Sequence, residues 1–220
     1  MKKVAVVTGL FGNFEKVHYT DCKNSYVVTT SKNKEQTNQI VKQGWNVYFV
    51  QEEHTNNLVE ASRQSKLVKT LKFLKPEAEY ILYIDHKWMI MQEHVDKLIS
   101  LIEGYPLLAF KNNADVYKEF FNSMCFKRYS VDMSRILTSV KKYEGHNVDM
   151  FLTGLMLYDT QHKDFDLILK SFNDSLLDDN HLQCQISFPI SIKDVSKTLI
   201  HNTLGLRHEY PEPAQAGLNF

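Results

Sequence analysis

The sequence predicts a single α/β domain with a mostly parallel central sheet. Short apolar segments of strand length alternate with segments of helical period through the first half of the chain. Tyr80–Ile84 is apolar at every position, as in a central strand that is buried on both faces of an α/β sheet. No internal repeat, low-complexity tract or linker divides the 220 residues, and domains average about 150 residues.

Strands are expected where β-branched and aromatic residues dominate short segments bounded by Gly, Asn or charged residues. In the first half these segments are 3–8, 26–30, 47–50, 80–84 and 107–110. The second half is less regular, and its one expected strand, 151–158, is interrupted by Thr153 and Gly154.

Helices are expected at 34–43, 57–74, 92–102, 116–124, 131–143 and 165–172. The clearest is 57–74, where apolar residues recur every three or four positions and Pro76 ends the helix. Its other face carries Arg63, Lys66, Lys69 and Lys72. That basic face has two interpretations. It is either a solvated surface or, at Arg63 and Lys66, a binding site for a diphosphate or a base.

Composition excludes some classes of function. Lys and Arg number 26, as do Asp and Glu, so long-range attraction to DNA or anionic lipid is not expected, although a local basic patch remains open. No apolar run approaches the roughly 20 residues of a membrane span, and the apolar N-terminal stretch is shorter than a secretory signal requires. The three cysteines are far apart and lack a C-x-x-C motif. We therefore expect a reducing, cytoplasmic compartment and no structural zinc.

Residues that could carry chemistry follow the predicted strands, because ligands of open α/β sheets bind beyond the carboxyl ends of the strands. These are 8–13, 29–31 and Asp85-His86-Lys87. Asp85 is the strongest candidate, since an acid that ends a doubly buried strand is costly unless it faces a polar site. The alternative is that Asp85 caps the next helix.

A dinucleotide-binding protein is one alternative, because Val7-Thr8-Gly9 and Gly12 resemble the start of an epimerase or short-chain dehydrogenase. Glu15 stands where the third glycine should fall, and no acid ends the second strand. Tyr83 and Lys87 have the Tyr-x-x-x-Lys spacing of that chemistry, but across a strand end they do not return to one face.

An ordered set of motifs covers roughly residues 3–190. The set comprises Thr8 to Phe14, Tyr26-Val27-Val28-Thr29-Thr30, Gly44-Trp45-Asn46-Val47, Arg63 to Lys69, Tyr80 to Asp85, the strand around Gly154, and Gln183 to Pro189. Together they resemble a GT-A-type glycosyltransferase. The closer resemblance is to the glycosyltransferase-like family that includes plant mucilage-related proteins and bacterial and phage relatives.

The resemblance implies a Rossmann-like GT-A fold that binds a nucleotide-sugar donor in residues 1–110 and the acceptor in 111–197, with a C-terminal arm at 198–220. The residues it assigns to the donor are Thr8 and Gly9 at the nucleoside, Thr30 at the base, and Arg63 and Lys66 at the base or phosphates. His201, Arg207 and His208, in the arm, are candidates to cover the phosphates. Asp149 and Gly154 fall on the acceptor side.

Two positions depart from the family pattern. Asp85 stands first in the Asp-x-Asp metal motif, but the third position is Lys87. The charge on the diphosphate is then balanced either by Mn²⁺ or Mg²⁺ on Asp85 or by Lys87 itself. Beside Gln185, which belongs to the catalytic motif, Cys184 replaces an acid. The general base is then Asp178, Asp179 or Asp149, with Asp179 our catalytic candidate, or it is missing.

The expected function is transfer of a hexose or pentose from a nucleoside-diphosphate sugar, for example a UDP-sugar, to an acceptor hydroxyl. The acceptor is a surface glycan or, in a phage-type DNA-modification enzyme, a hydroxymethylated base. Lysines and arginines between 111 and 142 form either a track for nucleic acid or scattered solvated charges. A catalytically dead nucleotide-sugar or partner-binding module is the main alternative, and an NAD(P)-dependent epimerase or dehydrogenase is the lesser one.

Overall fold

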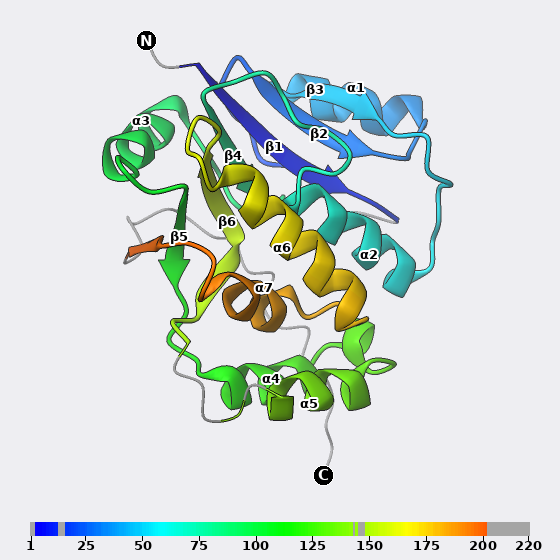
Figure 1. The fold of residues 1–220 in the computed structure, drawn as a ribbon. Coiled ribbons are helices and arrows are strands. Elements are labelled where there is room, and N and C mark those ends of the chain that lie inside the picture. Colours follow the sequence, from blue (N-terminus) through cyan, green and yellow to red (C-terminus); the bar gives the residue numbers. More distant parts are fainter. Residues whose placement is uncertain (1–2, 13–15, 143, 145–147, 202–220) are drawn as a thin grey trace.

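The computed structural model describes residues 3–12, 16–142, 144 and 148–201 (Figure 1). They form one seven-stranded sheet of order β3-β2-β1-β4-β6-β5-β7. Only β6 runs antiparallel to its neighbours, β4 and β5, and every other pair is parallel. The expected α/β fold with a mostly parallel sheet is confirmed.

The strands of the first half form where the sequence predicts them. Their bounds are β1 Val4–Leu10, β2 Ser25–Thr29, β3 Asn46–Phe49, β4 Tyr80–Ile84 and β5 Leu107–Lys111. All five residues of β4 are buried, as expected for a strand covered on both faces.

Helices cover both faces of the sheet (Figure 1). Their bounds are α1 Lys34–Lys42, α2 Leu58–Lys69, α3 Gln92–Leu101, α4 Val116–Met124, the 3-10 turn η1 Lys127–Tyr129, α5 Met133–Lys142, α6 Phe165–Asp178 and α7 Cys184–Ile192. One core packs α2, α6 and α7 on one face, and a second packs α1 and α3 on the other. The helices α4 and α5 lie beyond the carboxyl ends of the parallel strands. No helix in the described part of the chain is long and apolar enough to cross a membrane.

The helix predicted over 57–74 begins at its Asn57 cap but ends at Lys69, well before Pro76. Its end is fixed by contacts from elsewhere in the chain. The Tyr158 hydroxyl donates to the Lys69 carbonyl at 2.8 Å, and Leu71 adopts the left-handed region with φ 55°. These tertiary contacts override the apolar period that continues to Leu74.

The second half departs further from the prediction. The strand β6, Phe151–Asp159, is continuous, and the expected interruption is a bulge at which pairing with β5 jumps from Met156 to Leu152. Helix α6 extends beyond Phe172 to Asp178. We did not predict α7, because it is buried on nearly every side and has little polar period. The expected loop at 198–220 is wrong for Thr198–His201, which form β7; residues 202–220 lie outside the described part.

Candidate functional site

A pocket of about 640 Å³ opens at the carboxyl ends of β1, β2 and β3. Its lining includes Thr30, Asn33, Gln36, Glu53 and His54. The Thr30 hydroxyl and the His54 Nδ1 lie 3.2 Å apart, so the position predicted for a base is part of this wall. A volume of several hundred Å³ with a few convergent polar groups is typical of small-molecule sites.

Helix α2 runs from this pocket toward Asp85. Gly12, at φ +78°, lines the pocket, and a Cβ atom there would come within 2.9 Å of the Ala61 Cβ on α2. The Gln64 amide donates to the Glu53 carbonyl at 3.1 Å. The pocket wall and α2 are therefore one packed unit.

Thr8 and Gly9, predicted to approach the nucleoside, are instead packed inside the sheet. A Cβ atom at Gly9 would meet the Val68 Cγ2 at 2.9 Å, so this glycine permits α2 to lie close on β1. Thr8 is fully buried, and its Oγ1 has no hydrogen-bond partner among the described residues. Neither residue lines the pocket.

Asp85, directly after β4, is held by two side chains. Its Oδ1 accepts a hydrogen bond from the Tyr83 hydroxyl at 2.5 Å and lies 3.1 Å from the Lys69 ammonium. The Lys69 side chain is 2% exposed, and its ammonium also donates to the Thr153 carbonyl at 2.8 Å. The buried Lys69 ammonium is thus paired with the Asp85 carboxylate and the Thr153 carbonyl. The interpretation of this basic face as a solvated surface is therefore wrong at Lys69.

The bulge in β6 shapes the other side of Asp85. It leaves Thr153, Gly154 and Leu155 without partners on β5, and the Gly154 carbonyl accepts from the Asp85 amide at 2.8 Å. A Cβ atom at Gly154 would lie 2.9 Å from the Asp85 Oδ2. Gly154 therefore makes room for the carboxylate, and it belongs to the surroundings of Asp85.

Lys66 and Cys184 complete what we call the Asp85 cluster, together with Tyr83, Asp85, Lys69 and Gly154. Burial opposes ionisation of Asp85, but the charges of Lys69 and Lys66 and the hydrogen bonds from Tyr83 and Lys69 outweigh it and hold the pKa of the carboxyl well below its usual range. Burial likewise opposes ionisation of the Cys184 thiol, and the same two lysines and a contact with the Thr153 hydroxyl lower its pKa.

Arg128 adds a third cation beside this cluster. Its guanidinium lies over the rings of Phe126 and Tyr129, at 5.0 and 4.9 Å from their centroids. Burial opposes the charge, but Tyr129 and Asp85 raise the pKa of Arg128. Its buried Nε has no hydrogen-bond partner among the described residues. Several cations thus face one end of β4.

The remaining cations predicted at this site are less enclosed. Lys87 is half-buried in the turn that follows Asp85. The Arg63 side chain is 40% exposed and lies 3.7 Å from Glu60. In the described part of the chain neither forms a hydrogen bond or ion pair with Asp85, whose charge Lys69 and Lys66 balance instead. The contact between Tyr83 and Asp85 could have been predicted from the sequence. The two residues are two positions apart at the end of a strand, so their side chains share a face.

Gln185 belongs to a second group, the Glu119 cluster, made of Asn112, Glu119, Ser123, Gln183 and Gln185. The Gln185 and Gln183 amides donate to the Glu119 Oε1 at 2.5 and 3.1 Å, and the Asn112 amide donates to Oε2 at 3.2 Å. Glu119 is 4% exposed, and no ion pair to it is found among the described residues. Sequence reasoning missed Glu119, because nothing on α4 marks an inward-facing acid.

Asp179, the predicted general base, has no contact with the Asp85 cluster or the Glu119 cluster among the described residues. Its side chain is 5% exposed, accepts from the Ser187 hydroxyl at 2.6 Å and lies 3.9 Å from the His181 Nε2. Its position after α6 explains this, since it caps the helix and anchors the start of α7. The structure does not bring Asp179 to the Asp85 cluster.

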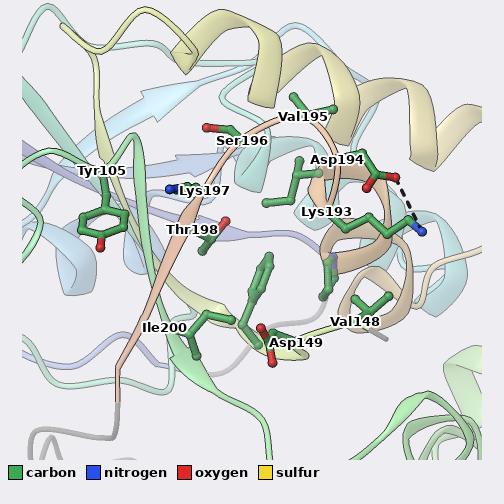
Figure 2. Close-up of a pocket in the computed structure, with 13 residues that line it drawn as sticks. Tyr105, Val148, Asp149, Lys193, Asp194, Val195, Ser196, Lys197, Thr198 and Ile200 are labelled. Atoms are coloured by element: carbon green, nitrogen blue, oxygen red, sulfur yellow. Dashed lines mark ion pairs between the residues drawn. The ribbon is translucent and has the colours of Figure 1, made fainter. Parts of the chain in front are cut away.

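Asp149 lines a separate cavity of about 500 Å³ between β7 and α7 (Figure 2). Phe151 and Ile192 lie on its apolar side, and the Lys193–Asp194 ion pair, at 3.6 Å, lies on its rim. His201 ends β7, half-buried. Arg207 and His208 lie outside the described residues.

Among the described residues, the surroundings of Asp85 supply few ligand atoms for a divalent metal ion. Its Oδ1 is already engaged by Tyr83 and Lys69, and the third position of the Asp-x-Asp motif is the cation Lys87. No group of three His, Cys, Asp or Glu side chains that could hold a metal occurs among the residues that the structure describes. Hard cations require several oxygen ligands, and this cluster supplies ammonium groups instead.

No protein-family model matches the sequence, and no curated protein matches it. Solved structures are similar in fold. The glycosyltransferase GlyE of Streptococcus pneumoniae matches with a TM-score of 0.50 at 14% identity, over 90% of this chain and 45% of that one. Glucosyl-3-phosphoglycerate synthase of Mycobacterium tuberculosis, in complex with Mn²⁺, UDP and phosphoglyceric acid, matches with a TM-score of 0.49 at 11% identity, over 95% and 71%.

A cytidylyltransferase from Leptospira borgpetersenii matches with a TM-score of 0.44 at 12% identity, over 93% of this chain and 77% of that one. The similar structures thus include glycosyltransferases and nucleotidyltransferases. At such identities the likeness concerns the fold alone. The expected fold is confirmed: the chain has the GT-A fold.

Proposed function

We propose that this protein transfers a sugar from a nucleoside-diphosphate sugar to an acceptor hydroxyl. The observation that carries the proposal is that a polar pocket of about 640 Å³ adjoins a cluster of buried and half-buried cations. The pocket at the ends of β1–β3 and the Asp85 cluster at the end of β4 are joined by α2, which contributes Lys66 and Lys69. That order suits a nucleoside followed by a diphosphate.

The cations have a chemical purpose in such a reaction. Breaking the bond between the anomeric carbon and the diphosphate leaves negative charge on the leaving oxygen, and preorganised positive groups stabilise it. Lys66, Arg128 and Lys87 are the candidates to contact the diphosphate. Lys69 is buried and engaged by Asp85 and Thr153, so we assign it to positioning Asp85. Because Tyr83 and Lys69 engage the Asp85 Oδ1 and Lys87 stands where the motif has a second acid, we propose transfer without a metal.

The Glu119 cluster explains how Gln185 is held in position. A carboxylate held by three amides fixes the first turn of α7, and Gln185 on that turn is half-buried. We propose that Gln185 faces the acceptor or the donor sugar and that Glu119 positions it. We propose two candidate classes of acceptor, a surface glycan and a hydroxymethylated DNA base.

The topology favours a transferase over a dinucleotide-dependent enzyme. In a dinucleotide-binding sheet the strand after the crossover continues in parallel, in the order 3-2-1-4-5-6, whereas here the antiparallel β6 lies between β4 and β5. The Tyr83 hydroxyl donates to Asp85, and burial together with Asp85 raises its pKa well above the usual value. It therefore stays protonated and does not supply the phenolate base of that chemistry.

Calorimetric titration of the purified protein with UDP, GDP, CDP, ADP and NAD(P), in EDTA and then with Mn²⁺ or Mg²⁺, tests the proposal. We expect one nucleoside diphosphate to bind in EDTA, and Lys66→Met to weaken it by about tenfold or more, since one charged phosphate contact contributes about 1.5–3 kcal/mol. Lys72→Met is the matched control, because Lys72 is exposed beyond the end of α2. Binding of NAD(P) alone would overturn the proposal.

Turnover separates an enzyme from a binding module. A panel of nucleotide sugars is incubated with the protein and released nucleoside diphosphate is measured, with and without candidate acceptors. An enzyme with Asp85→Ala should lose turnover by orders of magnitude, about 10³-fold for loss of a central electrostatic group. Nucleotide binding without any turnover would assign the chain to the catalytically dead module.

A further inference from the structure

A segment beyond the carboxyl edge of the sheet exposes an unusual set of large apolar side chains. On α4, Tyr117, Phe121 and Met124 are 40%, 61% and 61% exposed, and Phe126 and Val131, around η1, are 46% and 62% exposed. We call these five residues the α4 surface. The three on α4 are spaced by four and three residues, so they form one stripe along the helix.

The opposite side of α4 is fully used in packing. Glu119 and Ser123 are buried in the Glu119 cluster, and Phe120 and Val116 pack against the core of α5 and α7. Helix α4 therefore packs on the core through other residues, and the exposed stripe is an additional apolar face. A helix with apolar residues on both its packed and its exposed sides is typical of a helix that meets a second apolar partner.

The charge of the same segment indicates what that partner is. Residues 111–142 contain seven lysines and arginines against three acids, in a chain whose total charge is zero. Two of the three acids, Glu119 and Asp132, are buried. Six of the cations are exposed: Lys111, Lys118, Lys127, Arg135, Lys141 and Lys142. Asp115 and Glu144 are exposed too, and the Tyr117 hydroxyl is hydrogen-bonded to the Glu144 carboxylate. Six exposed cations against these two exposed acids leave the accessible charge of the segment positive.

We propose that the α4 surface binds the interface of a membrane that contains anionic lipid. Amphipathic segments with aromatic and aliphatic residues flanked by lysines insert their apolar side chains at the boundary of headgroups and acyl chains, and the lysines attract anionic headgroups. A second copy of this chain fits less well, because two such positive surfaces repel. The aromatic side chains of this surface could stack on bases, but Met124 and Val131 add neither a planar face nor charge, so nucleic acid also fits less well.

The location gives this binding a consequence. The segment follows β5 at the end of the sheet where the Asp85 and Glu119 clusters lie, and Glu119 itself belongs to α4 (Figure 1). A membrane bound there faces the same end of the molecule as the proposed site. Membrane binding itself does not depend on the proposed transferase activity, and it is measured without any nucleotide sugar.

Co-sedimentation of the full chain with phosphatidylcholine vesicles, with and without phosphatidylglycerol, tests the proposal. We expect binding to the vesicles that contain phosphatidylglycerol, weakened by added NaCl. The double variant Phe121→Ser/Met124→Ser should weaken binding by about tenfold or more, because it removes two inserted apolar side chains. Leu177→Ser is the matched control, since Leu177 on α6 is 75% exposed and lies outside the segment.

A charge variant tests the second part of the proposal. Lys118→Glu/Lys127→Glu should weaken binding by about tenfold or more and flatten its salt dependence, at about 1 kcal/mol for each lysine near an anionic surface. Lys42→Glu/Lys72→Glu is the matched control, because both lysines are exposed elsewhere. Circular dichroism shows whether each variant is folded.

Three outcomes would overturn the proposal. One is the absence of vesicle binding by the folded wild-type protein, and another is equal binding by Phe121→Ser/Met124→Ser. The third is a protein that ignores vesicles but forms dimers in sedimentation velocity, or binds DNA, through these same side chains.

Discussion

Two carboxylates lie on either side of the first turn of α7, and the protein treats them differently. Asp85 is surrounded by Lys69, Lys66 and the Tyr83 hydroxyl, and its side chain is 37% exposed. Glu119 is 4% exposed and is held by three side-chain amides. Asp85 is thus paired with cations, whereas Glu119 accepts hydrogen bonds from neutral amides.

The difference indicates that the two carboxylates have different roles. Positive charge around Asp85 exceeds what one carboxylate needs, so an anionic ligand would be attracted there. The amides around Glu119 carry no net charge, and their value is geometric, because a hydrogen-bonded network in a low dielectric fixes side chains in one arrangement. We therefore expect changes at Asp85 to affect ligand charge and changes at Glu119 to affect geometry.

The largest effect should come from Asp85→Asn, which leaves the buried Lys69 ammonium without its counter-ion. Breaking a fully buried pair costs about 3–5 kcal/mol, and we expect about 2–3 kcal/mol because solvent reaches Asp85. Urea denaturation measures this loss. Lys69→Met in the same background should restore part of the stability, and a further loss there would contradict the pairing.

A smaller effect is expected from Glu119→Gln, about 1–2 kcal/mol of unfolding free energy. The amide oxygen still accepts from one or two of the three donors, but the charge that strengthens these bonds is gone. Nucleotide affinity should stay within about twofold of the wild type, while turnover falls if Gln185 is displaced. A large loss of nucleotide affinity would show that the two clusters are not separate.

Gly154→Ala should cost about 1 kcal/mol, because its Cβ would lie 2.9 Å from the Asp85 Oδ2 and push the carboxylate from its partners. A double-mutant cycle with Asp85→Asn measures this coupling in urea. If the cost arises through Asp85, the two losses should not add. Additive losses would place the strain elsewhere in β6.

The smallest effect concerns pH. The folded pKa of Asp85 lies below its unfolded value, so Asp85 contributes stability above the unfolded pKa of about 3.9, and this contribution is lost as the pH falls toward the folded pKa. The gap in unfolding free energy between wild type and Asp85→Asn should be constant from about pH 5 to 8 and narrow below about pH 4. We expect a change under about 1 kcal/mol, since solvent screens Asp85. A gap that widens in acid would reverse the assigned sign.

Much of the fold was predictable because local signals and tertiary packing agree there. The five strands predicted in the first half and the helices α1, α3 and α4 form within two residues of their expected bounds. Asp85 could also be singled out, since an acid at the end of a doubly buried strand needs a polar environment. Its partner Lys69 could not, because a lysine on an amphipathic helix resembles a solvated one.

The sequence by itself determined the alternation of strands and helices, the central strand β4 and the place of Asp85 at its end, because apolar period and strand ends are local properties. Only the tertiary structure decided that β6 runs antiparallel with a bulge, that α7 is a helix, and that Glu119 faces Gln183 and Gln185. These features depend on contacts between residues far apart in the chain. Such contacts leave no period in the sequence.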